Sequence, residues 1–161
     1  MPKKIIKTNA IRMLEKAGLD FKIHDYQDTD AVSGVEIASV LNEDPDKVFK
    51  TLVTVSKSGQ NYVFMVPVEK ELDLKKAANS VNEKAISMVK SKELLPLTGY
   101  IHGGCSPIGM KKLFTTVLHI SAENYENIFF SGGKIGIQIE TTKEALLKLV
   151  PFKLCDIVVD E

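Results

Sequence analysis

The sequence lacks most of the features that define specialised protein classes. It contains no tryptophan and only two cysteines, Cys105 and Cys155, which form no CxxC pattern. Neither a disulfide framework nor a metal site is expected, because a framework needs several cysteines and a metal site needs a recurring set of His, Cys or carboxylate ligands. Hydrophobic runs are short, so no signal peptide or membrane segment is predicted and the cytoplasm is the expected compartment. No cofactor is expected.

The chain also lacks an excess of charge of either sign. Lysine and arginine total 21, as do aspartate and glutamate, so the formal net charge is zero. Non-specific binding to nucleic acid depends on phosphate neutralisation by excess positive charge. The composition therefore argues against a general DNA- or RNA-coating protein, and no DNA partner is expected. A local basic cluster can still contact one end of a tRNA.

The remaining composition is that of an ordinary globular protein. The 161 residues are 44% hydrophobic and 26% charged, which predicts a single domain over residues 1–161. Apolar periodicity and turn residues predict interspersed helices and strands. Helices are expected at 10–17, 33–41, 73–78, 91–95, 121–125 and 141–150, and strands at 21–26, 48–55, 62–66, 86–89, 113–120, 128–131, 135–140 and 157–159.

Several local signals set the ends of these elements. Thr8 or Asn9 is expected to cap the first helix, and Ser33 and Glu36 fit a capping box for the second. Pro96 is expected to end its helix, and Gly132-Gly133 is expected to form a tight turn. Hairpins among the strands favour a mixed, mainly antiparallel sheet. The expected fold is α+β, with the sheet forming a partly closed barrel that helices surround.

Lys50 is the first candidate functional residue, because it lies in an apolar strand at 48–53. A lysine in an apolar wall is partly desolvated, which makes its ammonium a stronger local charge for a phosphate, a hydroxyl or an oxyanion. The alternative is an ordinary lysine whose stem is buried and whose charged end reaches water.

Two glycine-rich segments are further candidates. The loop at 103–109 contains three glycines, whose backbone N–H groups can point at an anionic or carbonyl oxygen. The segment at 131–136 places the hydroxyl of Ser131 beside Gly132-Gly133. Either segment can also be a simple connection between strands.

A nucleophile supplied by the protein is not indicated by the sequence. Cys105 and Ser106 are adjacent, but a nucleophile needs a nearby base, and the three histidines follow no recognised signature.

In combination these segments resemble the YbaK/EbsC family, free-standing relatives of the editing domain of bacterial prolyl-tRNA synthetases. The similarity runs in order from about Thr8 to the C-terminus. The matching stretches are Phe49-Lys50-Thr51-Leu52, Leu74-Lys75-Lys76-Ala77-Ala78, Thr98-Gly99-Tyr100, the loop from Gly103 to Gly109, Ser131-Gly132-Gly133-Lys134, Gln138-Ile139-Glu140 and Asp156-Ile157-Val158.

The resemblance implies a set of site residues. The family's catalytic lysine, glycine-loop contact and serine fall on Lys50, Gly103 and Ser131, and a pocket aromatic falls on Tyr26. A second pocket aromatic falls near Ser33, where this chain has none, and this departure bears on side-chain selectivity. Further substrate contacts are expected at Gly104, Ser106, Pro107, Gly132 and Gly133.

The resemblance also implies an activity, the deacylation of Cys-tRNA(Pro), with Cys-tRNA(Cys) as a further substrate. In the family, the cysteine thiol of the substrate attacks its own ester carbonyl and releases a cyclic thiolactone, so the protein supplies positioning and charge. The implied partners are the acceptor end of mischarged tRNA and prolyl-tRNA synthetase.

Two alternatives remain open at this point. One is deacylation of another small amino acid, alanine or serine, by water. The other is a non-catalytic binding or regulatory module, because a fold alone does not establish activity. The second alternative is favoured if Lys50, Gly103 and Ser131 lie on separate surfaces.

Overall fold

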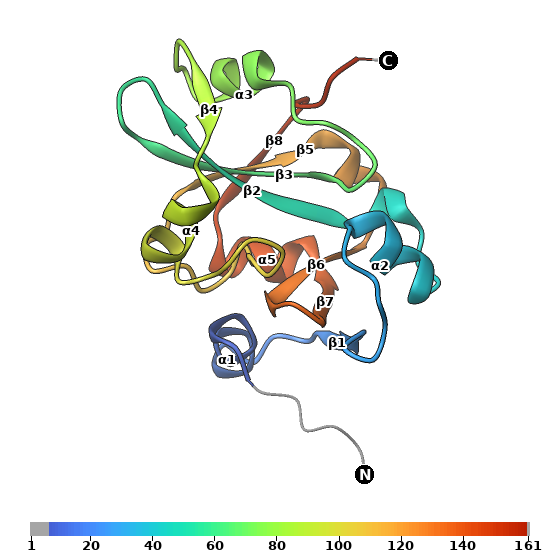
Figure 1. The fold of residues 1–161 in the computed structure, drawn as a ribbon. Coiled ribbons are helices and arrows are strands. Elements are labelled where there is room, and N and C mark those ends of the chain that lie inside the picture. Colours follow the sequence, from blue (N-terminus) through green and yellow to red (C-terminus); the bar gives the residue numbers. More distant parts are fainter. Residues whose placement is uncertain (1–6, 161) are drawn as a thin grey trace.

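The computed structural model describes residues 7–160, in which helices and strands alternate along the chain (Figure 1). The helices are α1 (Asn9–Lys16), α2 (Gly34–Val40), α3 (Leu74–Ser80), α4 (Ser91–Thr98) and α5 (Lys143–Leu149), with short 3-10 helices η1 (Pro45–Lys47) and η2 (Ile120–Asn124). The strands are β1 (Lys22–Asp25), β2 (Phe49–Ser56), β3 (Asn61–Pro67), β4 (Ile86–Met88), β5 (Thr115–His119), β6 (Asn127–Lys134), β7 (Ile137–Thr142) and β8 (Phe152–Cys155).

The strands form two sheets. The smaller sheet has the order β1-β7-β6 and is antiparallel throughout, whereas the larger has the order β4-β2-β3-β5-β8. In the larger sheet β4, β2 and β3 pair antiparallel, and β5 pairs parallel with both β3 and β8. The mixed, mainly antiparallel α+β fold expected from the sequence is confirmed.

The expected partly closed barrel is not confirmed, because residues 7–160 form two open sheets. A single isolated bridge between Val48 and Phe129 links the start of β2 to β6. Closure of a barrel needs continuous strand pairing around its circumference, and one bridge does not provide it. The bridge nevertheless brings the first half of β2 close to β6, and this contact positions the site described below.

The main hydrophobic core lies between the two sheets. Phe130, Ile137 and Ile139 of the smaller sheet pack with Phe49 and Leu118 of the larger one, and all five are essentially inaccessible to solvent. Helices α1 and α5 cover this core with Leu14 and Leu146. A second cluster packs α3 against the opposite face of the larger sheet, where α3 lies in Figure 1. The larger sheet is therefore buried on both faces.

Side-chain caps begin several helices where the sequence predicted them. The hydroxyl of Thr8 accepts the backbone N–H of Ile11 at the start of α1. Ser33 and Glu36 form the complete capping box at the start of α2. Such caps satisfy backbone donors that have no partner within the helix. The helix predicted from 141 instead begins at Lys143, two residues later, with Thr142 as its N-cap.

The glycine pair at 132–133 is not the turn that the sequence predicted. Both glycines lie within β6, and the register slips between Ser131, which pairs with Gln138, and Lys134, which pairs with Ile137. The extra residues form a bulge, and the chain turns after it, at residues 135–136. A glycine is required because a Cβ on Gly132 would lie 2.6 Å from the Ile137 side chain.

Two other boundaries differ from expectation. Pro96 lies inside α4, which continues to Thr98 and ends at Gly99 in the left-handed conformation (φ +88°). Gly99 rather than Pro96 ends the helix, because its left-handed conformation turns the chain away while its N–H donates to the Leu95 carbonyl. The last strand is β8 rather than 157–159, where Val158 forms only an isolated bridge with Leu72.

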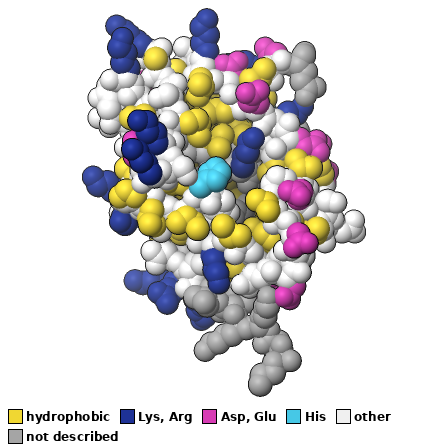
Figure 2. Space-filling view, in the orientation of Figure 1, with side chains coloured by type: hydrophobic (Ala, Val, Ile, Leu, Met, Phe, Trp, Pro, Cys, Tyr) yellow, Lys and Arg dark blue, Asp and Glu magenta, His cyan; other side chains and the backbone are white. Residues whose placement is uncertain are grey.

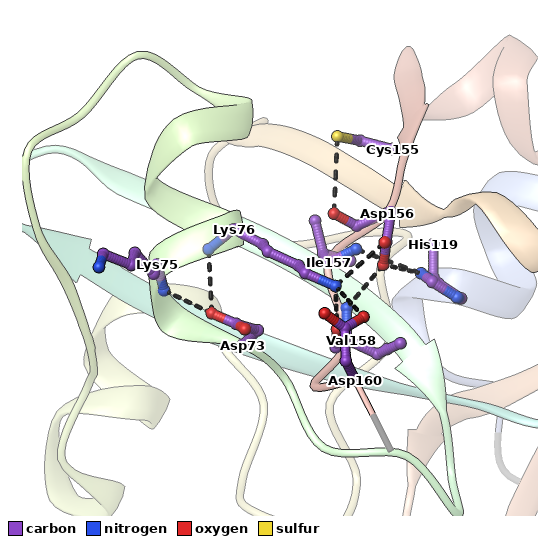
Figure 3. Close-up of polar contacts among 9 residues, drawn as sticks. All are labelled: Asp73, Lys75, Lys76, His119, Cys155, Asp156, Ile157, Val158 and Asp160. Carbon is purple, nitrogen blue, oxygen red and sulfur yellow. Dashed lines mark hydrogen bonds and ion pairs between the residues drawn. The ribbon is translucent and has the colours of Figure 1, made fainter.

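Lys76 of α3 holds the end of the chain against the larger sheet (Figure 3). Its ammonium donates to the Asp156 and Asp160 carboxylates at 3.0 and 2.7 Å and to the Val158 carbonyl at 2.8 Å. The Ile157 N–H donates to Nδ1 of His119, and burial lowers the pKa of this histidine. The cluster therefore has a structural role.

Among residues 7–160, no helix has the length and hydrophobicity that a bilayer crossing requires.

Candidate active site

A cavity of about 440 Å³ opens where β2 passes β6. Its walls come from β2, from β6 and β7 of the smaller sheet, from the start of α2, from α4 and from the loop at 102–105. Hydrophobic side chains gather over the middle of the face shown in Figure 2, between α4 and α2, with lysines and carboxylates around them. A cavity of this size and lining is typical of a small-molecule site.

Lys50 lines this cavity from β2, close to the bridge that connects the two sheets. Its side chain is half-buried, and this burial lowers the pKa of its ammonium, while the charge of Glu71 partly offsets the effect. Among residues 7–160, no hydrogen bond or ion pair to a side chain engages its Nζ atom. The ammonium is thus a poorly solvated charge that can bind an anionic or developing negative oxygen.

Gly103 lines the same cavity from the loop that follows α4. Its φ of +87° is a conformation that favours glycine. The Gly104 N–H closes a turn onto Ile101, whereas the Gly103 N–H has no acceptor among residues 7–160. A free backbone N–H beside a cavity is a group that can stabilise an oxyanion.

Ser131 and Tyr26 complete the predicted set in the cavity wall. Ser131 lies on β6 just before the bulge, and its hydroxyl oxygen accepts the N–H of Gly133 while its own proton remains available. Tyr26 follows β1 and is buried, and this burial raises the pKa of its phenol. Three distant segments therefore bring Lys50, Gly103 and Ser131 to one cavity.

The other five residues expected to contact substrate do not line this cavity. Three of them are glycines in tightly packed surroundings, where an added Cβ atom would meet a neighbouring atom at 2.6–3.0 Å: Gly104, Gly132 and Gly133. The buried Ser106 hydroxyl accepts the Ile108 N–H, and Pro107 lines a separate cavity of about 110 Å³. These positions shape the loop and the bulge, and direct contact with substrate stays a prediction.

Burial makes Cys105 a poor nucleophile, although its side chain lines the cavity. The thiol is buried, and this burial raises its pKa to about 12, despite a hydrogen bond with Thr98 that acts in the opposite direction. Thiolate is the reactive form of cysteine, so this thiol is essentially unreactive at neutral pH. This argues against Cys105 as a nucleophile.

Sequence reasoning missed Gln138 as a cavity residue, although the stretch that contains it was noted for its resemblance. Gln138 is directly opposite Ser131 in the β6–β7 pair and is 3% exposed. Strand alternation provided a signal, because Ile137 and Ile139 occupy the core face and Gln138 must face the other way. Ser33, at the position where the family aromatic was expected, also lines the cavity. No cluster of three potential metal ligands occurs within residues 7–160.

Comparisons with known proteins agree on one family. The aminoacyl-tRNA editing domain family matches residues 29–149. A protein of Enterococcus faecalis (strain ATCC 700802 / V583), named "Putative Cys-tRNA(Pro)/Cys-tRNA(Cys) deacylase EbsC", is 42% identical over 156 residues, which cover 96% of this chain and 95% of that protein.

Solved structures share the fold. One described as a "putative trans-editing enzyme for prolyl tRNA synthetase" superimposes with a TM-score of 0.84 at 24% identity and covers 97% of this chain and 100% of its own. The hypothetical protein APE2540 gives a TM-score of 0.85 at 18% identity, covering 94% and 100%. Residues 29–149, which the family matches, supply most of the cavity wall, and the 42% identity extends over nearly the whole chain. The chain therefore belongs to the aminoacyl-tRNA editing domain family.

Proposed function

We propose that this aminoacyl-tRNA deacylase acts in trans on cysteine esterified to tRNA(Pro), with Cys-tRNA(Cys) as a further substrate. The observation that carries the proposal is the meeting of Lys50, Gly103 and Ser131 around one cavity. A binding module has no need for this convergence of a desolvated ammonium, a free backbone N–H and a hydroxyl. The name of the 42% identical relative supports cysteine as the amino acid.

In the proposed reaction, the thiol of the bound cysteine attacks its own ester carbonyl. A carbon–sulfur bond forms, the carbon–oxygen bond to the ribose breaks, and the thiol proton passes to the leaving ribose oxygen. The products are a cyclic cysteine thiolactone and free tRNA. This reaction needs no nucleophile from the protein, in agreement with the raised pKa of the Cys105 thiol.

The three predicted catalytic residues then supply charge and orientation. The Gly103 N–H stabilises the oxyanion on the attacked carbonyl, since it is free to donate. The Lys50 ammonium and the Ser131 hydroxyl hold the terminal adenosine and the substrate backbone. Closure of the substrate around its own thiol is promoted when the ester is held in a productive orientation.

The proposed partners are the acceptor end of mischarged tRNA and prolyl-tRNA synthetase, and the proposed compartment is the cytoplasm. A chain with zero net charge gains little affinity from non-specific phosphate contacts. Association with a synthetase that already holds the tRNA supplies the missing affinity.

The test is a single-turnover deacylation assay with Cys-, Ala- and Ser-tRNA(Pro). We expect rapid release of cysteine alone, and a loss of about 100-fold in rate for Lys50→Ala, the size expected when a bound substrate is misplaced. Lys57→Ala is the matched control, because Lys57 is an exposed lysine just after the same strand. Unchanged cysteine release by Lys50→Ala would show that this cavity is not the active site.

A substrate analogue tests the mechanism. S-methylcysteine on tRNA(Pro) has no attacking thiol, so we expect it to persist in the presence of the protein. Its release at the cysteine rate, or release of alanine and serine, would instead indicate attack by water.

A further inference from the structure

Glu43 and Gln138 join two walls of the cavity through their side chains. Glu43 follows α2, whose first residues line the cavity, and Gln138 lies in the wall formed by β7. Gln138 Nε2 donates to Glu43 Oε1 at 2.9 Å. The second oxygen of each group, Glu43 Oε2 and Gln138 Oε1, is buried and has no hydrogen-bond partner among residues 7–160.

Two buried oxygens that accept no hydrogen bond, on side chains that already contact each other, destabilise the folded state. Each unsatisfied buried polar atom does so because it has lost its hydrogen bonds to water and gained none in return. A carboxyl and a carboxamide are both planar forks, so two such groups joined by one hydrogen bond can close a ring through their second oxygens when one of these carries a proton. A single proton on Glu43 turns its second oxygen into a donor and satisfies both atoms at once.

The surroundings of Glu43 favour that proton. Burial raises the pKa of this carboxyl, the hydrogen bond from Gln138 and the charge of His24 oppose the rise, and the charge of Glu140 adds to it. Glu140 lies two residues after Gln138, on the same face of β7, and its negative charge is the one that favours a proton on Glu43. Burial would raise its pKa, but hydrogen bonds from His24 and Asn127 outweigh burial and lower it.

We propose that Glu43 is a protonated carboxylic acid that forms a cyclic acid–amide pair with Gln138 and positions it opposite Ser131 in the cavity. Glu43 is thus a positioning residue. When it ionises, its second oxygen can no longer donate, and the segment after α2 separates from the smaller sheet. The effect on deacylation rests on the function proposed above, whereas the pair itself does not.

Glu43→Gln is the decisive variant, because a second carboxamide makes the same two hydrogen bonds at every pH. Glu126→Gln is the matched control, since Glu126 is exposed and its side chain forms no hydrogen bond or ion pair among residues 7–160. The first measurement follows the side-chain carboxyl carbons by ¹³C NMR during a pH titration, with these two variants providing the assignments. We expect the Glu43 carboxyl to titrate above the ordinary range of a glutamate side chain.

Two functional readouts accompany the titration. As the pH rises through the Glu43 transition, the wild-type deacylation rate should fall about tenfold relative to Glu43→Gln, the loss expected for one buried hydrogen bond. The thermal stability of the wild type should fall relative to the same variant over that range, because the folded state binds the Glu43 proton more tightly. Glu126→Gln should show neither trend.

A Glu43 carboxyl that titrates in the ordinary glutamate range, as expected if a water molecule satisfies the two oxygens, overturns the proposed acid–amide pair. A constant rate ratio overturns the positioning role. If no deacylation occurs at all, the proposed function fails, while the titration and the stability measurements still decide the acid–amide pair.

Discussion

At the scale of single residues, the site depends on backbone conformation as much as on side chains. Gly103 has a φ of +87°, and a Cβ there would meet only the Ile135 side chain at 3.6 Å. Gly109 has a φ of +83°, but a Cβ there would lie 2.7 Å from the Tyr100 hydroxyl. An alanine at position 103 would therefore have enough space but an unfavourable backbone conformation, whereas an alanine at position 109 would have both an unfavourable conformation and a steric overlap.

We therefore expect Gly103→Ala to lower the free energy of unfolding by about 1–2 kcal/mol, the cost of a left-handed conformation for an L-residue. Gly109→Ala should cost more, because steric overlap adds to this strain. Urea unfolding measures both. Deacylation should nevertheless fall further in Gly103→Ala, in which the N–H beside the cavity is displaced. Full activity in Gly103→Ala would show that this N–H does not serve the reaction.

At the scale of elements, a side-chain hydrogen bond between His24 and Glu140 attaches β1 to β7 on the outer face of the smaller sheet. His24 Nε2 lies 2.8 Å from Glu140 Oε1, and Asn127 donates to the other oxygen at 3.0 Å. These hydrogen bonds outweigh burial and lower the pKa of the Glu140 carboxyl. Stability from a lowered carboxyl pKa is present above the unfolded-state pKa and is lost as the pH falls through the folded-state pKa.

Glu140→Gln should accordingly reduce the free energy of unfolding at neutral pH by about 1–2 kcal/mol, as expected for hydrogen bonds to a charged group. The difference from the wild type should shrink as the pH falls into the range where carboxylates take up protons. Chemical unfolding at a series of pH values measures it. A difference that stays constant with pH would mean that the charge of Glu140 does not stabilise the strand pair.

The bulge in β6 sets the direction of Ser131, and Gly132→Ala tests it. The added Cβ would lie 2.6 Å from the fully buried Ile137 side chain, so we expect a loss of about 1–3 kcal/mol in unfolding free energy. Ser131→Ala provides the contrast, since it removes the hydroxyl and leaves the bulge intact. It should reduce deacylation with little change in stability. Equal stability of Gly132→Ala and the wild type would show that the bulge tolerates a side chain.

At the scale of the whole molecule, the balance of charge governs the encounter with tRNA. A protein with 21 basic and 21 acidic residues should make few phosphate contacts on its own. Because each contact adds about 0.7–0.9 to the slope of log affinity against log salt, we expect a slope of roughly 1–3 for tRNA binding by the isolated chain. Addition of prolyl-tRNA synthetase should accelerate deacylation at limiting protein. A steep slope, near 10, with no effect of the synthetase would contradict this expectation.

Local chemistry determined much of the secondary structure from the sequence alone. The caps at Thr8 and Ser33 and the β2–β3 hairpin were predictable because they depend on neighbouring residues. Family resemblance gave Lys50, Gly103, Ser131 and Tyr26, and all four line the cavity. Pro96 and the pair Gly132-Gly133 were misread. Proline and glycine permit several outcomes, and packing against distant residues selects one.

Only the tertiary structure decided how these pieces come together. The strands form two open sheets, which a single bridge between Val48 and Phe129 connects. This bridge brings β2 close to β6, although the two strands are far apart in the sequence. The pairing of Glu43 with Gln138 depends on the same long-range arrangement. The sequence determines which side chains prefer burial and where turns form. The neighbours of a half-buried polar group are set by contacts between distant segments, which periodicity along the chain does not encode.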